Sequence, residues 1–336
     1  MKVLVTGGGG FLGGAIVRML KERGDQVISY SRSSYPALAT LGVQQICGNI
    51  VDKAALTAAA QGCDIIFHVA AKAGIWGDYA EYYLTNVSGT EAVIDACLVN
   101  NIDRLVATGS PSVVFNGRDI EGGNETLPYP IHYESHYPQT KMLAELLVLN
   151  ANSADLATVS LRPHLIWGPG DNHLVPRIIQ KAKAGRLKRI GTSPCLADTV
   201  YIDNAAKAHL LAADRLSPGS KIAGKAYFIT NDEPVPLWEM VDRILAAGGL
   251  PPVRSKISPQ LARIIGFGYE KIWGLLRLSG EPPMTRFVAS ELSTAHWFDI
   301  SAAKRDLGYG PEVSIEEGLK RLHEWLSTSG LLAEKR

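Results

Sequence analysis

The sequence has few cysteines and no long apolar run, and each absence narrows the class of protein. Its four cysteines, among 336 residues, form no CxxC pair, so we expect neither a disulfide framework nor a metal site. No stretch approaches the roughly 18 consecutive apolar residues of a membrane-spanning helix. The strand predicted from Lys2 leaves no room for a signal peptide, so we expect a cytoplasmic location.

An excess of either charge is also absent. The chain has 34 Lys and Arg against 33 Asp and Glu, which gives a formal net charge of +1. Because no basic stripe stands out, nucleic acid is not an expected partner. A hydrophobic content of 46% is typical of a globular protein. The length suffices for one large α/β domain or for two lobes around a shared core.

Glycine, by contrast, is concentrated at the start of the chain. Residues 2–6 predict a short apolar strand, and four glycines then lead into a helix. Such a turn needs glycine because a pyrophosphate must approach the amide groups at the helix start. Two frames fit a dinucleotide fingerprint, one starting at Gly8 and one at Gly7, and the glycine run does not decide between them. The residues expected to bind the dinucleotide here are Gly7, Gly10, Phe11, Leu12 and Gly13.

The end of the second predicted strand, residues 26–30, indicates which dinucleotide binds. NAD-preferring folds carry an acidic residue about 20 positions after the glycines, where it holds the ribose 2′-hydroxyl. This sequence has Ser31, Arg32 and Ser33 there instead. An arginine makes charge-assisted hydrogen bonds to a 2′-phosphate, and serines add hydroxyl donors. We therefore expect NADP(H), with a solvated surface arginine as the alternative interpretation.

Short β patterns alternate with helical stretches through the first half of the chain. Strands are expected at residues 44–47, 64–69, 104–108 and 158–162. This alternation predicts an α/β fold with a Rossmann-type, doubly wound parallel sheet. Ligands of such sheets lie at the carboxyl ends of the strands. The residues expected there are Asn49, Ala70, Ala71, Lys72 and Ser110.

The regular βα alternation fades after Trp167, where residues 168–171 predict a turn. We expect residues 1–167 to form an NADP-binding Rossmann domain. Residues 168–336 are expected to form mainly a smaller C-terminal substrate-binding lobe. Within it, residues 197–232 are expected to return to the first sheet through strands at 199–202 and 226–230.

A tyrosine and a lysine four residues apart carry the predicted chemistry. Tyr137 and Lys141 would share one face of a helix, and Pro138 is tolerated in its first turn. A nearby lysine cation lowers the pKa of a phenol from about 10, which prepares a proton donor. Ser110 could hold a carbonyl oxygen beside the phenol, and Ser112 is a competing candidate. A surface helix pair is the alternative for the tyrosine and lysine.

Together with further motifs, these residues resemble the extended short-chain dehydrogenase/reductases over nearly the whole chain. The motifs are residues 6–13, Asn86-Val87-Ser88-Gly89-Thr90, Ser110 with Val113, residues 137–141, and Leu161-Arg162-Pro163 leading to Gly168-Pro169-Gly170-Asp171. The resemblance implies that Tyr137 is the catalytic acid/base and that Ser110 orients the carbonyl. It also implies that Lys141 binds the nicotinamide ribose while lowering the tyrosine pKa.

The same resemblance implies further cofactor contacts. They are Asn49, Ile50, Ala70, Ala71, Lys72, Asn86, Pro163 and Ile166. Two positions depart from the family pattern. Asn49 stands where many members have an aspartate, and Gly109 replaces a frequent hydroxyl residue.

Stretches in the second half resemble the 3β-hydroxysteroid dehydrogenase branch, notably residues 226–234 and 307–311. Residues 70–77, 166–173 and 295–297 resemble a narrow group of long-chain 3-oxoacid reductases within it. This implies an NADPH-dependent reduction of the C3 ketone of a long-chain 2-alkyl-3-oxoalkanoic acid, in olefin hydrocarbon biosynthesis. The resemblance also implies a homodimer through helices around residues 78–100 and 137–150, and association with other pathway enzymes.

Residues 261–277 predict an amphipathic helix. Its apolar half contains Leu261, Ile264, Ile265, Tyr269, Ile272, Trp273, Leu275 and Leu276, and its charged half contains Arg263, Glu270, Lys271 and Arg277. Such a helix can roof an apolar substrate tunnel, lie on a membrane surface, dock on a partner enzyme, or face the core in the ordinary way. The residues expected to contact substrate are Ser112, His173, Arg177 and Trp273, with a surface or interlobe role as the alternative for the arginine.

Three other functions remain alternatives. A 3β-hydroxysteroid or other hydrophobic alcohol dehydrogenase would use the same three catalytic residues. A sugar-nucleotide epimerase would bind a bulky polar substrate, which agrees poorly with the apolar half of the 261–276 helix. An NADP-sensing scaffold protein would have no need of a proton donor.

Overall fold

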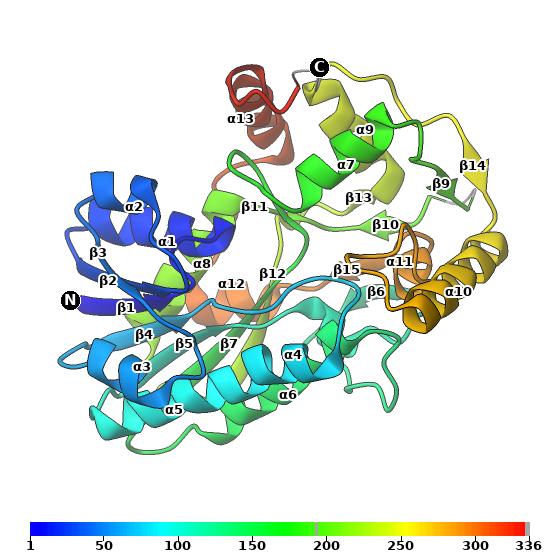
Figure 1. The fold of residues 1–336 in the computed structure, drawn as a ribbon. Coiled ribbons are helices and arrows are strands. Elements are labelled where there is room, and N and C mark those ends of the chain that lie inside the picture. Colours follow the sequence, from blue (N-terminus) through cyan, green and yellow to red (C-terminus); the bar gives the residue numbers. More distant parts are fainter. Residues whose placement is uncertain (192–193, 333–336) are drawn as a thin grey trace.

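The computed structural model describes residues 1–191 and 194–332 and is built on a seven-stranded parallel sheet (Figure 1). The strand order is β12-β7-β5-β4-β1-β2-β3, and all neighbouring strands run parallel. The predicted α/β fold with a Rossmann-type sheet is therefore confirmed. The strands are β1 (Lys2–Thr6), β2 (Gln26–Ser31), β3 (Gln44–Cys47), β4 (Ile65–His68), β5 (Arg104–Thr108), β7 (Ala157–Pro163) and β12 (Lys225–Ile229).

Helices cover both faces of this sheet because its strands are apolar on both sides. On β1, Val3 and Val5 pack into one core cluster, and Leu4, which points the opposite way, packs into another. The first cluster lies under α1 (Phe11–Glu22) and α8 (Ile202–Arg215), and the second under α3 (Lys53–Ala59) and α5 (Gly89–Val99). Other elements of this part are α2 (Pro36–Thr40), α4 (Tyr79–Tyr83), the π-helical turn η1 (Leu84–Ser88), the 3-10 turn η2 (Pro111–Val114), α6 (His136–Asn150) and α12 (Ser301–Leu307).

A second group of elements lies beyond the carboxyl ends of the central strands (Figure 1). It contains a four-stranded sheet in the order β13-β10-β15-β6 and the short pair β14-β9. These strands are β6 (Ile120–Gly123), β9 (Arg189–Ile190), β10 (Leu196–Ala197), β13 (Val235–Pro236), β14 (Lys256–Ile257) and β15 (His296–Phe298). The helices are α7 (Leu174–Lys183), α9 (Leu237–Ala247), α10 (Pro259–Leu276), α11 (Arg286–Glu291) and α13 (Ile315–Thr328). Within the described ranges, no helix combines the length and apolar character that crossing a bilayer requires.

The strand expected at residues 199–202 does not join the central sheet, so that prediction is wrong. The observed strand, β11 (Val200–Tyr201), pairs instead with β8 (Ile166–Trp167) in a separate two-stranded sheet. The chain turns after β7 at Leu165, whose φ is +42°, and β8 thereby leaves the central sheet. The buried Trp167 indole then donates a hydrogen bond of 2.9 Å to Thr199, which holds the second segment beside β8.

The carboxyl ends of β1 and β4 are joined by a buried polar chain that starts at Thr6. The Thr6 hydroxyl oxygen accepts hydrogen bonds from the backbone N–H groups of Val69 (3.1 Å) and Ala70 (3.2 Å). It also lies 2.9 Å from Nδ1 of His68. Thr6 therefore fixes the segment that leaves β4, directly beside the glycine turn that leaves β1.

The chain continues from His68 into α5. His68 Nε2 lies 2.9 Å from the hydroxyl of Thr90, which donates its own proton to the backbone carbonyl of Asn86. Thr90 must then accept a proton from Nε2–H, so Nδ1 accepts from Thr6. Burial, with a smaller contribution from the charge of Lys141, lowers the pKa of His68 to about 3. The imidazole is therefore neutral near pH 7 and serves as a structural connector.

Replacing Thr6 with valine keeps the shape of the side chain but removes the hydroxyl. We expect Thr6→Val to lower the free energy of unfolding by about 1–3 kcal/mol, because buried donors lose their acceptor. Urea unfolding followed by circular dichroism measures the change. The matched control is Thr40→Val, because Thr40 is exposed and donates only to the carbonyl of Ala37 at 2.9 Å. Its expected loss is below about 0.5 kcal/mol, and equal losses in both variants would contradict a role for the buried chain.

Candidate active site

The glycine turn between β1 and α1 fits a pyrophosphate. Gly7 has φ +70°, and a Cβ atom there would lie 2.9 Å from the Cα atom of Ala70. A Cβ at Gly13 would lie 2.2 Å from the carbonyl oxygen of Gly7, so only glycine allows α1 to approach the turn this closely. Gly10 caps α1 without a side-chain acceptor, and the first helical turn, with Phe11 and Leu12, has no acidic residue. The helix start therefore offers free N–H groups and the positive end of its dipole to an anion.

The structure also distinguishes the two glycine frames. The N–H of Gly10 donates to the carbonyl of Gly7 at 2.9 Å. Gly7 has the positive φ, whereas Gly8 does not. The turn is therefore built on Gly7, Gly10 and Gly13, although a Cβ at Gly8 would also meet the Ser29 hydroxyl at 2.6 Å.

The ends of β2 and β3 present the residues expected at the adenosine end. Ser31 is partly buried, whereas Arg32 and Ser33 are exposed, and Arg32 forms no ion pair within the described part of the chain. Asn49 follows β3, is exposed, and accepts a 3.0 Å hydrogen bond from Tyr30 at its backbone carbonyl. Ile50 is buried against Gly89. The arginine is thus free to meet an anionic ligand group.

Tyr35 is a neighbour of the glycine turn that was not among the residues expected there from the sequence. Its ring lies so close to Gly9 that a Cβ there would come within 2.0 Å of a ring carbon. Gln45 holds the backbone of Tyr35 by donating to its carbonyl at 3.1 Å and accepting from its N–H at 2.7 Å. The aromatic position shortly after Arg32 is the sequence signal that could have indicated this contact.

Asn86, on the π-helical turn η1, is hydrogen-bonded both to the loop after β4 and to helix α6. Its side-chain oxygen accepts from the N–H of Lys72 at 2.7 Å, and its amide donates to the carbonyl of Lys72 at 3.1 Å. The amide also donates to the hydroxyl of Thr140 on α6 at 3.0 Å. The segment of Ala70, Ala71 and Lys72 is therefore fixed both to the glycine turn and to the helix that carries Tyr137. Single π-helical turns within α-helices occur often at functional sites.

Tyr137 and Ser110 meet at the carboxyl end of β5. Burial raises the pKa of the Tyr137 phenol above its ordinary value, and a hydrogen bond with Ser110 opposes that shift. The Ser110 oxygen also lies 2.8 Å from the Ser112 hydroxyl and accepts from the Ser112 N–H at 3.3 Å. Ser110 is thus the serine that is hydrogen-bonded to the phenol, and Ser112 is hydrogen-bonded to Ser110.

Lys141 lies one helical turn beyond Tyr137 and is buried. Its ammonium donates a 2.6 Å hydrogen bond to the backbone carbonyl of Thr108. Burial lowers the pKa of Lys141 to about 8, and Glu145 partly opposes this shift. The expectation that the lysine leaves the pKa of Tyr137 lowered is wrong for this structure, because burial of the phenol outweighs the effects that favour its ionised form.

Glu145 and Arg162 form a buried ion pair beneath this site, which sequence reasoning missed. Arg162 Nη2 lies 2.6 Å from Glu145 Oε1, and Ser160 donates to the same carboxylate at 2.8 Å. A Cβ at Gly109 would lie 2.6 Å from the Ser160 oxygen and 2.8 Å from Glu145 Oε2. The departure at Gly109 therefore has a steric cause. The four-residue spacing puts Glu145 on the same helix face as Lys141, but no local signal in the sequence connects it with Arg162.

Past the end of β7, after Pro163 and beside Ile166 of β8, the chain carries further titratable groups. His164 Nδ1 lies 2.6 Å from Asp198, and the His164 ring contacts His296 edge-on at 5.0 Å between centroids. Burial raises the pKa of Glu291 to about 7, with the charge of His164 opposing. The positive φ of Leu165 marks backbone strain at this turn. No pattern in the sequence joins these positions, because they come from separate segments.

The remaining predicted substrate residues have contacts of their own in the structure. Arg177 forms a 2.7 Å ion pair with Glu281, so it connects α7 to the segment before α11. His173 caps α7, and its N–H donates to Asp171 at 2.7 Å. Trp273 lies on α10 with its ring edge-on to Tyr269, 5.7 Å between centroids. Within the described residues, none of these three side chains is hydrogen-bonded to Tyr137, Ser110 or Ser112.

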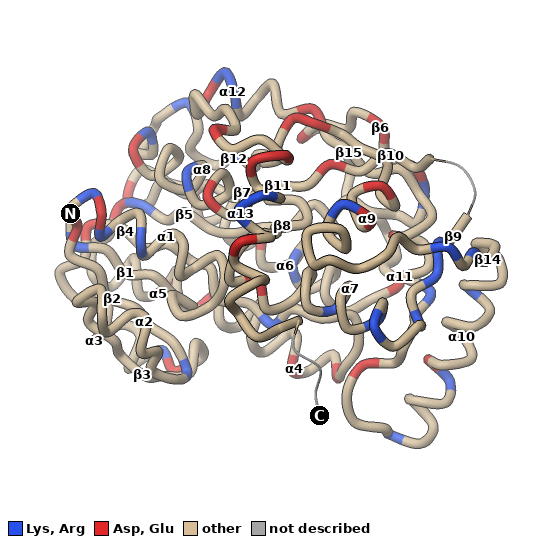
Figure 2. The backbone as a smooth tube through the Cα atoms, turned by 90° about the horizontal axis from the view of Figure 1, so that it is seen from above, with Lys and Arg blue, Asp and Glu red and all other residues tan. Residues whose placement is uncertain are grey.

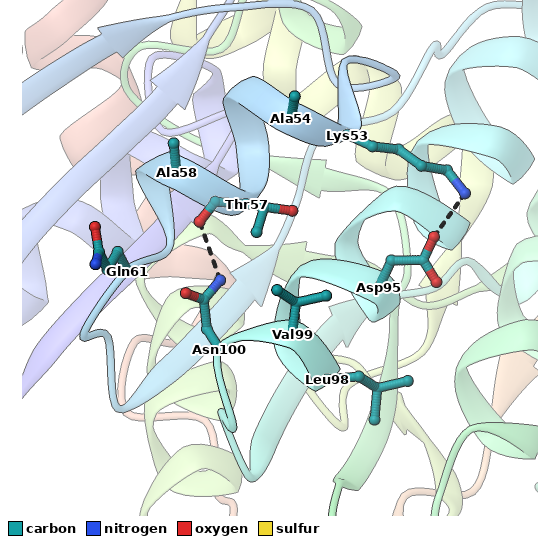
Figure 3. A pocket seen from close by; sticks show the side chains of 9 residues that line it. All are labelled: Lys53, Ala54, Thr57, Ala58, Gln61, Asp95, Leu98, Val99 and Asn100. Carbon is teal, nitrogen blue, oxygen red and sulfur yellow. Dashed lines mark hydrogen bonds and ion pairs between the residues drawn. The ribbon is translucent and has the colours of Figure 1, made fainter.

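A groove of about 750 Å³ lies between α3 and α5 (Figure 3). It is bridged by a 2.6 Å ion pair between Lys53 and Asp95 and by a 3.0 Å hydrogen bond from Asn100 to the Thr57 carbonyl. None of the predicted catalytic or cofactor residues lines it. In the part of the chain that the structure describes, no three His, Cys, Asp or Glu side chains are grouped to hold a metal ion.

Residues 4–258 match the 3-beta hydroxysteroid dehydrogenase/isomerase family. The chain therefore belongs to this family of extended short-chain dehydrogenase/reductases and is an oxidoreductase that acts on a hydroxyl or keto group.

Proteins of similar sequence indicate which members of this family the chain resembles. The chain is 53% identical over 324 residues to the 2-alkyl-3-oxoalkanoate reductase of Stenotrophomonas maltophilia (strain K279a), covering 96% of this chain and 98% of that protein. It is 49% identical over 326 residues to the 2-alkyl-3-oxoalkanoate reductase of Shewanella oneidensis, covering 95% and 84% of the two chains. The solved UDP-glucuronic acid 4-epimerase from Bacillus cereus, in complex with NAD, superposes with a TM-score of 0.75 at 21% identity, over 98% of this chain and 99% of that one, and shows the fold alone.

The pKa of Lys141 gives the site a pH dependence. We expect kcat/KM for ketone reduction to fall as the pH rises through about 8, because Lys141 loses its positive charge there. Tyr137 keeps its proton over the same range because burial raises its pKa. Following the absorbance of the reduced dinucleotide from roughly pH 6 to 10 measures this limb. The Lys141→Ala enzyme should react more slowly and show no such fall in kcat/KM at alkaline pH. If the fall persists in that variant, another group causes it.

Proposed function

We propose that this chain is an NADPH-dependent reductase of the C3 ketone of long-chain 2-alkyl-3-oxoalkanoic acids. The product is the 2-alkyl-3-hydroxy acid, an intermediate of olefin hydrocarbon formation. The observation that carries the substrate assignment is the 53% identity, over 96% of the chain, to a protein named 2-alkyl-3-oxoalkanoate reductase. The contact of Tyr137 with Ser110 beside the buried Lys141 supports the chemistry.

NADP(H) fits the residues at the glycine turn and at the end of β2. The free N–H groups at the start of α1 suit a pyrophosphate, and Arg32, which has no ion-pair partner among the described residues, suits a 2′-phosphate. Residues 1–167 hold this cofactor in the proposal, with Ser31, Ser33, Asn49, Ile50, residues 70–72, Asn86, Pro163 and Ile166 around it. Residues 168–336 form mainly the substrate-binding lobe.

The reaction assigns a separate role to each of the three central side chains. Ser110 donates a hydrogen bond to the ketone oxygen, and Tyr137 donates its proton to the alkoxide that forms there. The ammonium of Lys141 stabilises the phenolate that remains. A reduced dinucleotide held through its pyrophosphate at the glycine turn would supply the hydride. Because burial raises the pKa of the phenol, Tyr137 keeps its proton near neutral pH and has it to donate when the alkoxide forms.

The proposal includes a cytoplasmic homodimer that associates with other pathway enzymes. Its interface would involve helices around residues 78–100 and 137–150. The support is a set of exposed apolar side chains on α4, η1 and α5, namely Tyr79, Tyr83, Leu84, Leu98 and Val99. Burying them against a second copy would remove apolar surface from water.

Removing the phenolic hydroxyl tests the catalytic assignment. We expect Tyr137→Phe to lower kcat with a synthetic long-chain 2-alkyl-3-oxo acid by about 10²- to 10⁴-fold, the usual contribution of general acid catalysis. The dissociation constant for NADPH, measured by fluorescence, should change little. Ser112→Ala is the matched control for Ser110→Ala, which should cause the larger loss. A Tyr137→Phe enzyme with wild-type turnover would contradict the mechanism.

Arg32 tests the cofactor assignment. We expect Arg32→Ala to raise the KM for NADPH at least about tenfold, because a charge-assisted bond to the 2′-phosphate is lost, and to leave the KM for NADH nearly unchanged. Initial rates with both coenzymes measure the effect. Arg118→Ala is the control, because Arg118 is also exposed and makes no ion pair within the described residues. A wild-type preference for NADH that Arg32→Ala leaves unaltered would exclude the NADP assignment.

A hydroxysteroid dehydrogenase is the second candidate, because the matched family carries that name. The same enzyme preparation assayed with long-chain β-keto acids and with 3β-hydroxysteroids separates the two. The proposal requires the higher kcat/KM with the keto acids. A sugar-nucleotide epimerase has only fold similarity at 21% identity in its favour, and an NADP-sensing scaffold would not need Tyr137.

A further inference from the structure

Helix α10 turns its aliphatic side chains outward. Its two buried residues are Ala262 and Gly266, and a Cβ at Gly266 would lie 2.6 Å from the carbonyl carbon of Thr285. The helix therefore packs closely on the start of α11 through its small residues. Six aliphatic side chains on the rest of the helix surface are between 38% and 84% exposed, namely Leu261, Ile264, Ile265, Ile272, Leu275 and Leu276. An ordinary surface helix turns this stripe toward the core, so the core-facing interpretation of residues 261–277 is wrong.

The charged side of α10 holds the helix in this orientation. Arg263 forms a 2.7 Å ion pair with Glu134, in the segment before α6. Glu270 accepts from the side chain of Arg286 and from its backbone N–H, both at 2.7 Å. These contacts lie on the same side of the helix as Gly266, and they fix its rotation about its own axis. The aliphatic face is thus a fixed part of the surface.

The surroundings of this face are strongly basic. Residues 251–280 contain five basic residues and one acidic residue, a formal charge of +4, whereas the whole chain carries +1. Arg254, Lys256, Lys271 and Arg277 are exposed and form no ion pair in the part of the chain that the structure describes. Figure 2 shows basic residues at β9 and β14 and along α10, at one end of the molecule.

We propose that α10 attaches this protein to the surface of an anionic lipid bilayer. The aliphatic face enters the boundary between headgroups and acyl chains, and the four unpaired cations meet the lipid phosphates. The helix lies along the surface, because its ion pairs with Glu134 and Arg286 hold its opposite side to the protein along its length. The attachment is independent of the reaction proposed above.

Charge decides against a second copy of the chain as the occupant. Two α10 faces brought together would oppose two clusters of formal charge +4, and like charges repel. Helices α4 and α5, which carry exposed apolar side chains, lie on another part of the molecule (Figure 1) and are available for self-association. An anionic bilayer satisfies both the aliphatic and the basic character of the α10 surface.

The test is sedimentation of the full chain with vesicles of phosphatidylcholine alone and with vesicles that also contain phosphatidylglycerol. We expect the partition coefficient to be at least about tenfold higher for the anionic vesicles and to fall as salt is raised. Lys256→Glu with Lys271→Glu should lower anionic binding at least about tenfold. Ile264→Glu with Leu275→Glu should reduce binding to the level seen with phosphatidylcholine.

Matched controls separate this surface from general effects of added charge. Leu41→Glu removes an equally apolar side chain, 38% exposed, far from α10 in the sequence and in the fold. Arg118→Glu with Lys320→Glu reverses two exposed charges elsewhere. These controls should bind vesicles as the wild type does, and circular dichroism with NADPH binding verifies that every variant is folded.

Three outcomes would overturn the proposal. One is equal binding to both kinds of vesicle that the lysine variants leave unchanged. Another is a wild-type protein that does not bind vesicles but forms an oligomer in sedimentation velocity, and the oligomer dissociates in the Ile264→Glu with Leu275→Glu variant. The third is absence of vesicle binding together with cross-linking of the α10 face to another protein, which would assign the surface to a protein partner.

Discussion

The hydrogen bonds of one buried amide hold the candidate site together. Asn86 contacts both backbone groups of Lys72 and the hydroxyl of Thr140, so it joins the loop after β4 to the helix that carries Tyr137. Ala70 in that loop lies against Gly7 of the glycine turn. The cofactor turn and the chemical groups therefore have a fixed separation. Three buried hydrogen bonds of the Asn86 side chain maintain this separation, because a buried donor or acceptor left without a partner would destabilise the fold.

Burial also sets the electrostatics of the site. Lys141 and the Glu145–Arg162 pair lie within one short stretch of α6 and β7, and all three are largely removed from water. The lysine responds with a lowered pKa, whereas the carboxylate is satisfied by Arg162, Ser160 and Tyr129. Lys141, whose pKa is about 8, thus lies beside a carboxylate that has one cationic partner and two hydroxyl donors. Burial is the main cause of the lowered pKa of Lys141, whose hydrogen-bond acceptor is an uncharged carbonyl.

Local signals explain which features the sequence predicted correctly. The bounds of β1, β3 and β5 agree with the predicted strands because each is a short apolar run ended by a turn, and the glycine turn is recognisable from its own residues. The pairing of β11 with β8 depends on the backbone at Leu165, which no pattern reveals. The sequence periodicity predicted both faces of α10 but not which face turns inward. That orientation depends on contacts distant in sequence, such as the one between Arg263 and Glu134, which lie 129 residues apart. The pKa of Tyr137 likewise depends on burial, which the spacing to Lys141 does not report.

The crowding at Gly109 has a consequence for how this family varies. The side chains of Ser160 and Glu145 occupy the volume that a side chain at position 109 would need, so the three positions share a single small space. A hydroxyl residue at 109 is compatible only with a rearranged acid or a smaller neighbour on β7. A single Gly109→Ser exchange would therefore require Ser160 or Glu145 to move, and substitutions at these three positions should be coupled.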